Sequence, residues 1–250
     1  MATEKPKTAQ GYDQDHTLLC ERVLVTLLRG FGTFKDTLRL VGGLVPRYLT
    51  PEQPPDVPAH AGTMDVDIVL NIQVLAEGEA YKVLAAQLKE QGFGRVIEDG
   101  KASSWRWERR ITEHQVVIVK FLRDETEEMP AGKAFSLEGE KISALAIRHA
   151  GIVHGWYSER DVTAELLDGR GTATERVRFA DAVSFIILKA LAFTQRAENK
   201  DAGDLVHVMR YYGPGLEALA DEFRSRLATG IHAKAIEEAL AALEQRFCGK

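Results

Sequence analysis

Hydrophobic residues in the first half of the chain switch between a helical period and short continuous runs. Leucine and valine recur at three- and four-residue steps over 16–29, which predicts an amphipathic helix with Asp15 as its N-cap. Runs rich in Val, Ile and Leu predict buried strands. The predicted elements of this half are a helix over 16–29, strands over 37–41 and 64–72, a helix over 77–91 and an antiparallel pair over 103–111 and 114–122.

Proline interrupts this pattern between the first two predicted strands. Five of the eight prolines lie between Pro46 and Pro58, where they argue against both a helix and a central strand. We therefore expect a long loop before the strand at 64–72. The sequence contains no internal repeat.

The second half of the chain becomes helical after a stretch of short strands. Residues 124–140 are acidic and interrupted by proline and glycine, which predicts a boundary loop. Strand-like pieces follow over 142–177, and Asn199 is a candidate cap for a helix that begins at 200. Helical periodicity is present over 179–196, 200–212, 215–228 and 232–247.

Together these elements predict an α+β fold. The first 14 residues are expected to form a flexible N-terminus. Residues 15–130 are expected to form a domain with a mixed sheet and flanking helices, and 140–250 a second domain with short strands followed by helices.

Composition and charge exclude several classes of protein. With 45% apolar and 28% charged residues, the chain is typical of a soluble globular protein and not of a disordered or fibrous one. A formal net charge of -5 provides no global field for nucleic acid, so any contact with a polyanion must be local. Cys20 and Cys248 lie far apart, and the polar N-terminus lacks an apolar core. We expect a cytoplasmic protein without disulfides and without contact with a membrane.

Several well-known catalytic motifs are absent from the sequence. It contains no GxxxxGK[ST], HExxH or GxSxG, and its two GFG segments lack the third glycine of a dinucleotide-binding turn. The seven histidines never pair at the spacing of metal ligands, so they are interpreted as ordinary core or surface residues.

Two aspartates interrupt the apolar strand predicted at 64–72. Asp65 and Asp67 point to the same face of a strand, with their Cα atoms about 6.6 Å apart. Two carboxylates in one apolar environment repel each other unless a cation lies between them. Mg²⁺, bound by one or two carboxylates and by the phosphates of a substrate, is the usual cation. The alternative is that both aspartates lie at a strand end, facing solvent or pairing with arginines.

The Gly-Gly pair and a lysine in an apolar helix each have two interpretations when taken alone. Gly42 and Gly43 end the first predicted strand, where they allow a phosphate to approach backbone N–H groups or simply form a tight turn. Lys189 interrupts an apolar helical stretch, and its amine needs either an anionic partner or a route to solvent. Asp201 and Asp204 follow in the next helix as candidate partners, or as ordinary acids of its first turns.

These three features, within VGG, GTMDVDI and LKALAFTQRAENKDAGDL, together resemble the abortive-infection (AbiEii-type) nucleotidyltransferase toxins of the polymerase-β-like superfamily. The family pattern combines a Gly-Gly or Gly-Ser turn, a Thr-x-Asp-hydrophobic-Asp strand and a helical segment with Lys, Arg, Lys-Asp and Asp-Leu. The resemblance covers about residues 37–209. The matching residues are Gly42, Gly43, Thr63, Asp65, Asp67, Lys189, Arg196, Lys200, Asp201 and Asp204.

The resemblance implies a nucleotidyltransferase fold in the first domain and metal-dependent transfer of a nucleoside monophosphate from a nucleoside triphosphate. It assigns Mg²⁺ or Mn²⁺ to Asp65 and Asp67, and catalysis to these two residues with Lys189 and Asp201. The nucleotide-binding residues that it implies are Gly42, Gly43, Thr63, Arg196, Lys200 and Asp204. It further implies an RNA acceptor, such as transfer RNA, or a protein acceptor, and a bacterial toxin with a cognate antitoxin.

Two features depart from the family pattern. A segment of 21 residues, which includes the proline loop, separates Gly43 from Asp65 and is longer than is usual. The superfamily also carries a third carboxylate on a later strand, where this chain presents Lys120. The acids nearest to that strand are Asp124 and Glu108, and we expect one of them to supply the third carboxylate of an active enzyme.

Two other classes of protein fit the same residues. A degenerate nucleotidyltransferase, which binds nucleotide or a partner without turnover, is favoured by the missing acid and opposed by the intact Asp-Val-Asp and Lys-Asp motifs. A DxD glycosyltransferase would use the same metal chemistry on a nucleotide sugar. It predicts a larger Rossmann-like half than the 64 residues before Asp65 provide.

Overall fold

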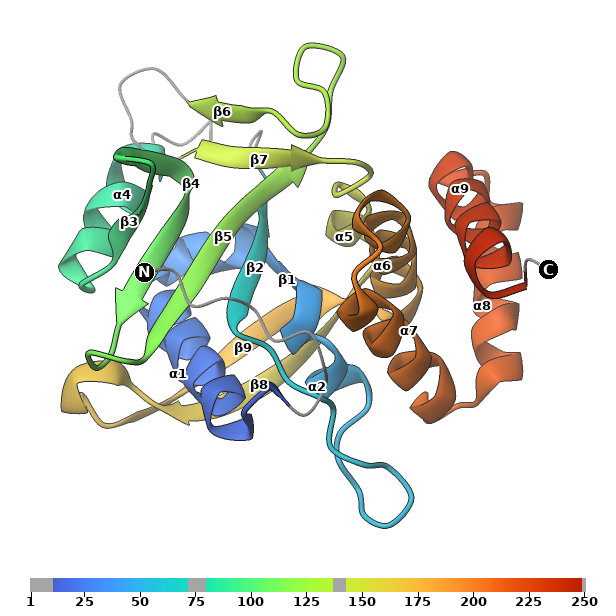
Figure 1. Cartoon of the computed structure of the whole chain (residues 1–250), viewed down its shortest axis with the longest axis horizontal. Helices are drawn as coiled ribbons and strands as arrows, with labels where there is room; N and C mark the ends of the chain where they lie inside the picture. The colour runs from blue at the N-terminus through green and yellow to red at the C-terminus, as the bar shows by residue number, and fades with distance from the viewer. Residues whose placement is uncertain (1–10, 72–79, 137–142, 249–250) are drawn as a thin grey trace.

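A computed structural model describes residues 11–71, 80–136 and 143–248 as an α+β fold (Figure 1). The expected fold class is confirmed, because a mixed sheet is flanked by helices and the C-terminal part is mainly helical. Residues 1–10 of the expected N-terminal segment lie outside the described residues. The same holds for the end of the strand expected at 64–72, the start of the helix expected at 77–91, part of the boundary loop at 137–140, and residue 142.

The bounds of the elements are as follows. The strands are β1 Leu38–Val41, β2 Asp65–Leu70, β3 Gly94–Glu98, β4 Lys101–Arg110, β5 Val116–Asp124, β6 Ala134–Ser136, β7 Ser143–Ile147, β8 Tyr157–Glu165 and β9 Thr172–Ala180. The helices are α1 Gln14–Phe31, α2 Pro46–Leu49, α4 Ala80–Glu90, α5 Ile152–Gly155, α6 Ala182–Arg196, α7 Asn199–Tyr211, α8 Leu216–Ala228 and α9 Ala233–Leu243.

The nine strands of the described residues form one mixed sheet in the order β3-β4-β5-β2-β1-β9-β8, with β7 paired to β5 and β6 paired to β7. Strand β2 lies near the centre, antiparallel to β1 and parallel to β5. Strand β1 also pairs in parallel with β9, so strands from the second half of the chain extend the sheet of the first half. The division of the chain into domains near 130–140 stays a prediction.

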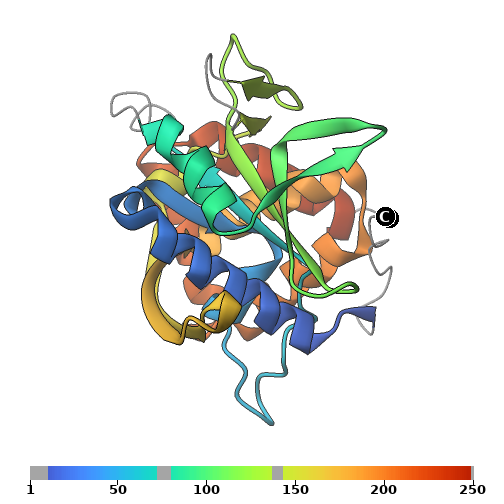
Figure 2. The same ribbon diagram turned by 90° about the vertical axis from the view of Figure 1, so that its left-hand side faces the viewer.

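Helices cover the sheet on one face and at one end. Helix α1 packs on β2, β5, β8 and β9 and buries an apolar stripe that includes Leu19, Val23 and Leu27 (Figure 2). Helix α6 starts directly after β9 and contacts α7, α8 and α9, which lie together beyond the sheet (Figure 1). No helix of the described residues has the length and apolarity needed to cross a bilayer.

The predicted helix caps were wrong by one or two residues. The cap of α1 is Asp13, whose side chain accepts from the Asp15 N–H, so Asp15 lies in the first turn. Glu198, not Asn199, precedes α7. Caps are assigned poorly from sequence because acidic residues are favoured both at the cap and within the first turn.

Two predicted boundaries also moved. The helix expected from 179 starts at Ala182, because residues 179 and 180 still belong to β9 and the Asp181 carboxylate caps the helix by accepting from the Ser184 N–H. The proline loop contains one short helix, Pro46–Leu49. Proline at the first helical position is tolerated because the N–H that it lacks would have no partner there.

Candidate nucleotide-binding cavity

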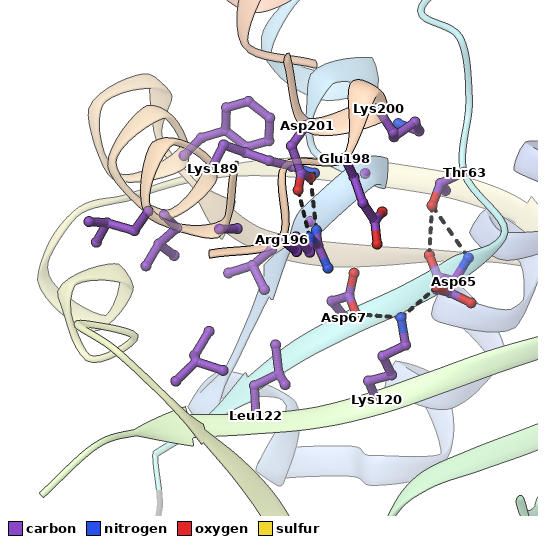
Figure 3. A pocket seen from close by; sticks show the side chains of 18 of the residues that line it. Thr63, Asp65, Asp67, Lys120, Leu122, Lys189, Arg196, Glu198, Lys200 and Asp201 are labelled. Carbon is purple, nitrogen blue, oxygen red and sulfur yellow. Dashed lines mark hydrogen bonds and ion pairs between the residues drawn. The ribbon is translucent and has the colours of Figure 1, made fainter. Parts of the chain in front are cut away.

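A cavity of about 320 Å³ lies where the central strands meet the helical part of the chain. Its walls come from the turn after β1, from β2 and β5, and from α6 and the start of α7 (Figure 3). Nine of the ten residues singled out by the resemblance line it, namely Gly42, Gly43, Thr63, Asp65, Asp67, Lys189, Arg196, Lys200 and Asp201. The tenth, Asp204, lies behind this wall and is 1% exposed. The tertiary structure therefore gathers segments that are more than 100 residues apart in sequence.

Lys120 lies between the two aspartates of the central strand. Strands β2 and β5 pair in parallel with Asp67 opposite Lys120, and their side chains share one face of the sheet (Figure 3). The Lys120 Nζ is 2.5 Å from Asp65 Oδ2 and 3.4 Å from Asp67 Oδ1. The positive charge that the two carboxylates need is thus supplied by the chain itself.

This arrangement fits a resident divalent cation poorly. Mg²⁺ held by both carboxylates would occupy the space between them, where the ammonium of Lys120 already lies. In the described part of the chain, no group of three or more His, Cys, Asp or Glu side chains is arranged to hold a metal ion. The lysine would have to leave Asp65, whose side chain is 6% exposed, before a metal could bind both aspartates.

The third carboxylate expected near β5 is not found at either residue predicted for it. Asp124 and Glu108 are both outside the residues that line the cavity. The Asp124 carboxylate lies against the backbone of Gly151, and Glu108 lies 3.6 Å from Arg110. Strand alternation places Asp124 on the face of Lys120, but Leu122 is the last residue of β5 that lines the cavity.

The glycine turn packs directly on the aspartate strand. Gly42 has a φ of 76°, which favours glycine, and a Cβ at this position would collide with the Asp67 carboxylate. A Cβ at Gly43 would lie 2.8 Å from the Thr63 Oγ1 and 3.4 Å from the Lys200 Nζ. Both glycines therefore allow an approach that any side chain would block. Both glycines also line the cavity.

Thr63 orients the start of the aspartate strand. Its hydroxyl accepts from the Asp65 N–H at 3.3 Å and contacts the Asp65 carbonyl oxygen at 3.2 Å. Its own backbone N–H donates to the Thr17 hydroxyl of α1 at 3.0 Å. Thr63 thus links α1 to the strand that carries the carboxylates.

Lys189 belongs to a buried network of charges. Its Nζ lies 2.8 Å from Asp201 Oδ1 and 2.7 Å from Asp204 Oδ2, and the residue is 7% exposed. Arg196 binds the Asp201 carboxylate through two nitrogens, at 2.6 and 2.8 Å. Of the alternatives that the sequence leaves open, the structure favours the anionic partner over the route to solvent.

Lys200 and His60 complete this network from the other side. Both contact Asp204 Oδ1, at 2.5 Å from the Lys200 Nζ and 2.8 Å from the His60 Nε2. The His60 Nδ1 accepts from the Gly62 N–H, so the ring carries its proton on Nε2 and donates it to Asp204. The end of the proline loop is therefore fastened to α7 beside the cavity.

The pKa values of this network follow from burial and from the packing of opposite charges. Burial raises the pKa of Asp204, but Lys189, His60 and Lys200 outweigh it and hold this pKa well below its usual value. Burial lowers the pKa of Lys189, yet Asp204 and Asp201 reverse this effect and raise it overall. For Lys200 burial prevails and its pKa is lowered. The two aspartates and Lys189 are therefore ionised at neutral pH.

Three residues of the site were missed by the sequence-based interpretation. Glu198 lines the cavity from the residue before α7, and its carboxylate points into it (Figure 3). Tyr12 also lines the cavity, with its ring 5.2 Å from the Lys200 Nζ. His60, at the end of the segment predicted as the proline loop, contacts Asp204 behind the cavity wall. No local pattern marks these residues, because long-range packing brings them to the site.

Comparisons with known proteins give little direct information. No protein-family model matches the chain, and a search of curated proteins finds no relative. Among solved structures, the chain is similar to an antigenic nucleotidyltransferase-like protein from Paracoccidioides brasiliensis, at 14% sequence identity and a TM-score of 0.48. The match covers 90% of this chain and 94% of that chain. At this distance, the function has to be inferred from the residues of the cavity.

Proposed function

We propose that the cavity binds a nucleoside triphosphate and that the chain is a nucleotidyltransferase, which transfers a nucleoside monophosphate to an RNA or protein acceptor. The observation that supports this proposal is the convergence of a side-chain-free glycine turn, two strand carboxylates and several cations on one cavity. These are the parts that a triphosphate and its transfer require.

Each wall of the cavity has a role in this proposal. The backbone at Gly42 and Gly43, which both line the cavity, receives phosphate oxygens. Lys200 lies next to Gly43, and Arg196 also lines the cavity, with its side chain 48% exposed. Lys189 and Asp201 act through Arg196 by fixing its position, so they are positioning residues.

The proposed reaction is a displacement at the α-phosphorus. The acceptor hydroxyl oxygen forms a bond to this phosphorus while the bond to the bridging oxygen of the β-phosphate breaks. Pyrophosphate leaves with the electron pair of that bond, and the hydroxyl proton passes to a carboxylate of the cavity. Asp67 and Glu198 both line the cavity and are the candidates to accept this proton.

The resemblance also bears on the biological role of the protein. It supports a toxin that modifies RNA, such as the end of a transfer RNA, or a protein, and that a cognate antitoxin neutralises. The matching motif residues are its only support. Growth arrest upon expression in a bacterial host, relieved by Asp67→Asn, is the expected result, and unimpaired growth of cells that express the intact chain would contradict this role.

The transferase is tested by incubating the protein with each of four α-labelled nucleoside triphosphates, Mg²⁺ or Mn²⁺, and separate RNA and protein acceptors. We expect label on one acceptor with one preferred nucleotide, and no label with Asp67→Asn. Lys234→Met, an exposed change on α9 far along the chain from the motif residues, serves as the matched control and retains transfer.

A second candidate is a nucleotide-binding protein without turnover. The specific observation that favours it is Lys120, which occupies the strand position of the third carboxylate and pairs with both aspartates. Saturable nucleotide binding without transfer to any acceptor would select this candidate. If the protein neither binds nor transfers any nucleotide, both candidates fail.

A further inference from the structure

Lys120 and the two aspartates form one compact charged group on the floor of the cavity. The parallel register of β2 and β5 fixes their backbones, with Asp67 directly opposite Lys120. The lysine Nζ contacts a carboxylate oxygen of each aspartate, at 2.5 Å and 3.4 Å. Its side chain is 17% exposed, so one side of the group faces the cavity while the rest is enclosed by the sheet.

The ammonium is held at this position by burial as well as by charge. If it turned away, the Asp65 carboxylate would lose this contact in an almost fully enclosed site. The other cations that line the cavity have carboxylates of their own: Arg196 and Lys189 contact Asp201, Lys200 contacts Asp204, and Arg148 contacts Glu238. A metal between Asp65 and Asp67 would therefore have to displace the Lys120 ammonium from its contacts with both carboxylates.

We propose that Lys120 replaces the divalent cation of this site: the chain holds no metal between Asp65 and Asp67, and the Lys120 ammonium itself contacts the phosphates of a bound nucleotide. The second half of this statement rests on the nucleotide binding proposed above. The first half concerns the protein alone and is independent of any substrate.

Removal of the lysine should open a metal site that the natural chain lacks. In Lys120→Asp, three carboxylates from adjacent strands face one another without an ammonium between them, which is an oxygen-rich site suited to Mn²⁺. We expect Mn²⁺ to bind this variant at least roughly 10- to 100-fold more tightly than the natural chain, because one neighbouring charge has about that effect on an ion and this substitution changes the local charge by two.

The probe for this experiment is Mn²⁺ alone, with the unbound ion measured by electron paramagnetic resonance. Lys101→Asp, at an exposed position on β4, makes the same change in net charge outside the cavity and should leave Mn²⁺ binding unchanged. Asp67→Asn, added to Lys120→Asp, should abolish the gain and so locate the ion. Tight Mn²⁺ binding by the natural chain that Asp67→Asn removes would overturn the proposal.

Lys120→Met provides a second variant, in case three close carboxylates prevent folding. It leaves only two facing carboxylates, so we expect a smaller gain in Mn²⁺ affinity, together with a melting temperature that rises on addition of Mn²⁺. A folded Lys120→Met protein that shows neither effect would also overturn the proposal.

Nucleotide titrations distinguish this inference from the proposed function. We expect the natural chain to bind its nucleotide with the same affinity in the presence of Mg²⁺ and in the presence of a chelator. Lys120→Met should lower the nucleotide affinity in the chelator by about 10- to 100-fold, which is the range for a hydrogen bond to a charged group. Binding that requires Mg²⁺ would refute the role of Lys120 and leave the nucleotide site intact. If no nucleotide binds under either condition while the Mn²⁺ results hold, the proposed function fails and the exclusion of metal by Lys120 stands.

Discussion

Replacement of Lys189 by methionine tests whether the buried charge network supports the fold. Methionine retains an unbranched apolar stem in helix α6 and removes only the ammonium. Asp201 and Asp204, which are 0% and 1% exposed, then lose the cation that contacts both of them. The variant therefore isolates the electrostatic role of the lysine from its packing.

The expected loss of stability can be estimated from the contacts that remain. Removing one partner of a buried ion pair costs about 3–5 kcal/mol, because a charge is left without compensation. Here Asp201 keeps both nitrogens of Arg196, and Asp204 keeps Lys200 and His60. We therefore expect the lower end of that range, about 3 kcal/mol.

Urea denaturation at neutral pH measures this loss, and its pH dependence tests the cause. The pKa of Asp204 is held below its usual value, so its contribution is present above about pH 3.9 and is lost as the pH falls through the folded-state pKa. The pKa of Lys189 is raised, so its contribution persists up to about pH 10.4 and is lost above that. The difference between natural and variant chains should therefore be largest near neutral pH and should narrow in acid.

Two results would refute this reasoning. One is a loss below about 1 kcal/mol, the level of a surface salt bridge, combined with a large loss of nucleotide affinity. Lys189 would then act on the ligand and not on the fold. The other is a loss of equal size at acidic and neutral pH, which would assign the effect to packing. Lys234→Met, an exposed lysine change on α9, is the control and should cost less than about 0.5 kcal/mol.

Three further predictions concern the site and one partly buried histidine, His154. Asp65→Asn combined with Asp67→Asn should destabilise the fold in urea, because Lys120 loses both carboxylates; an increase in stability would show that their mutual repulsion dominates. Gly42→Ala should cost about 1–3 kcal/mol in the same assay, since its φ is 76° and the new Cβ meets Asp67, and an unchanged midpoint would contradict that geometry. Burial lowers the pKa of His154 to about 4, so the stability that its neutral form provides is present above about pH 6.5 and is lost as the pH falls through 4. His154→Asn should flatten the pH dependence of the unfolding free energy over that range. A pH profile identical to that of the natural chain would assign the dependence to another group.

The helix and strand pattern was predictable where one face of an element is buried over a long run. The apolar periodicity of α1 and α6 and the apolar strand β2 are visible in the sequence, because burial dictates their spacing. Their ends were less certain. Asp13 and Asp15 are equally good caps by residue type, and only the path of the chain before α1 decides between them.

The candidate site was predictable to the extent that its chemistry is local. Asp65 and Asp67 had to share a face because alternate residues of a strand do so, and two carboxylates in an apolar strand need a cation unless they face solvent. The likeness of the Gly-Gly turn and of the Lys-Asp helix to a family pattern suggested which other residues to examine. All but Asp204 of the residues so chosen line the cavity.

From the sequence alone, the two aspartates required either a cation or an exposed strand end, and the tertiary structure shows that Lys120 lies against both of them. Lys120 reaches them because β2 and β5 pair in parallel, and strand pairing depends on contacts between segments that are remote in sequence. In the same way, Lys189 had to find an anion or solvent, and the packing of α6 on α7 selected Asp201 and Asp204. The local sequence pattern shows that a charged side chain in an apolar segment needs a partner or access to solvent, because burial makes an uncompensated charge costly. Only the fold determines which partner lies within reach.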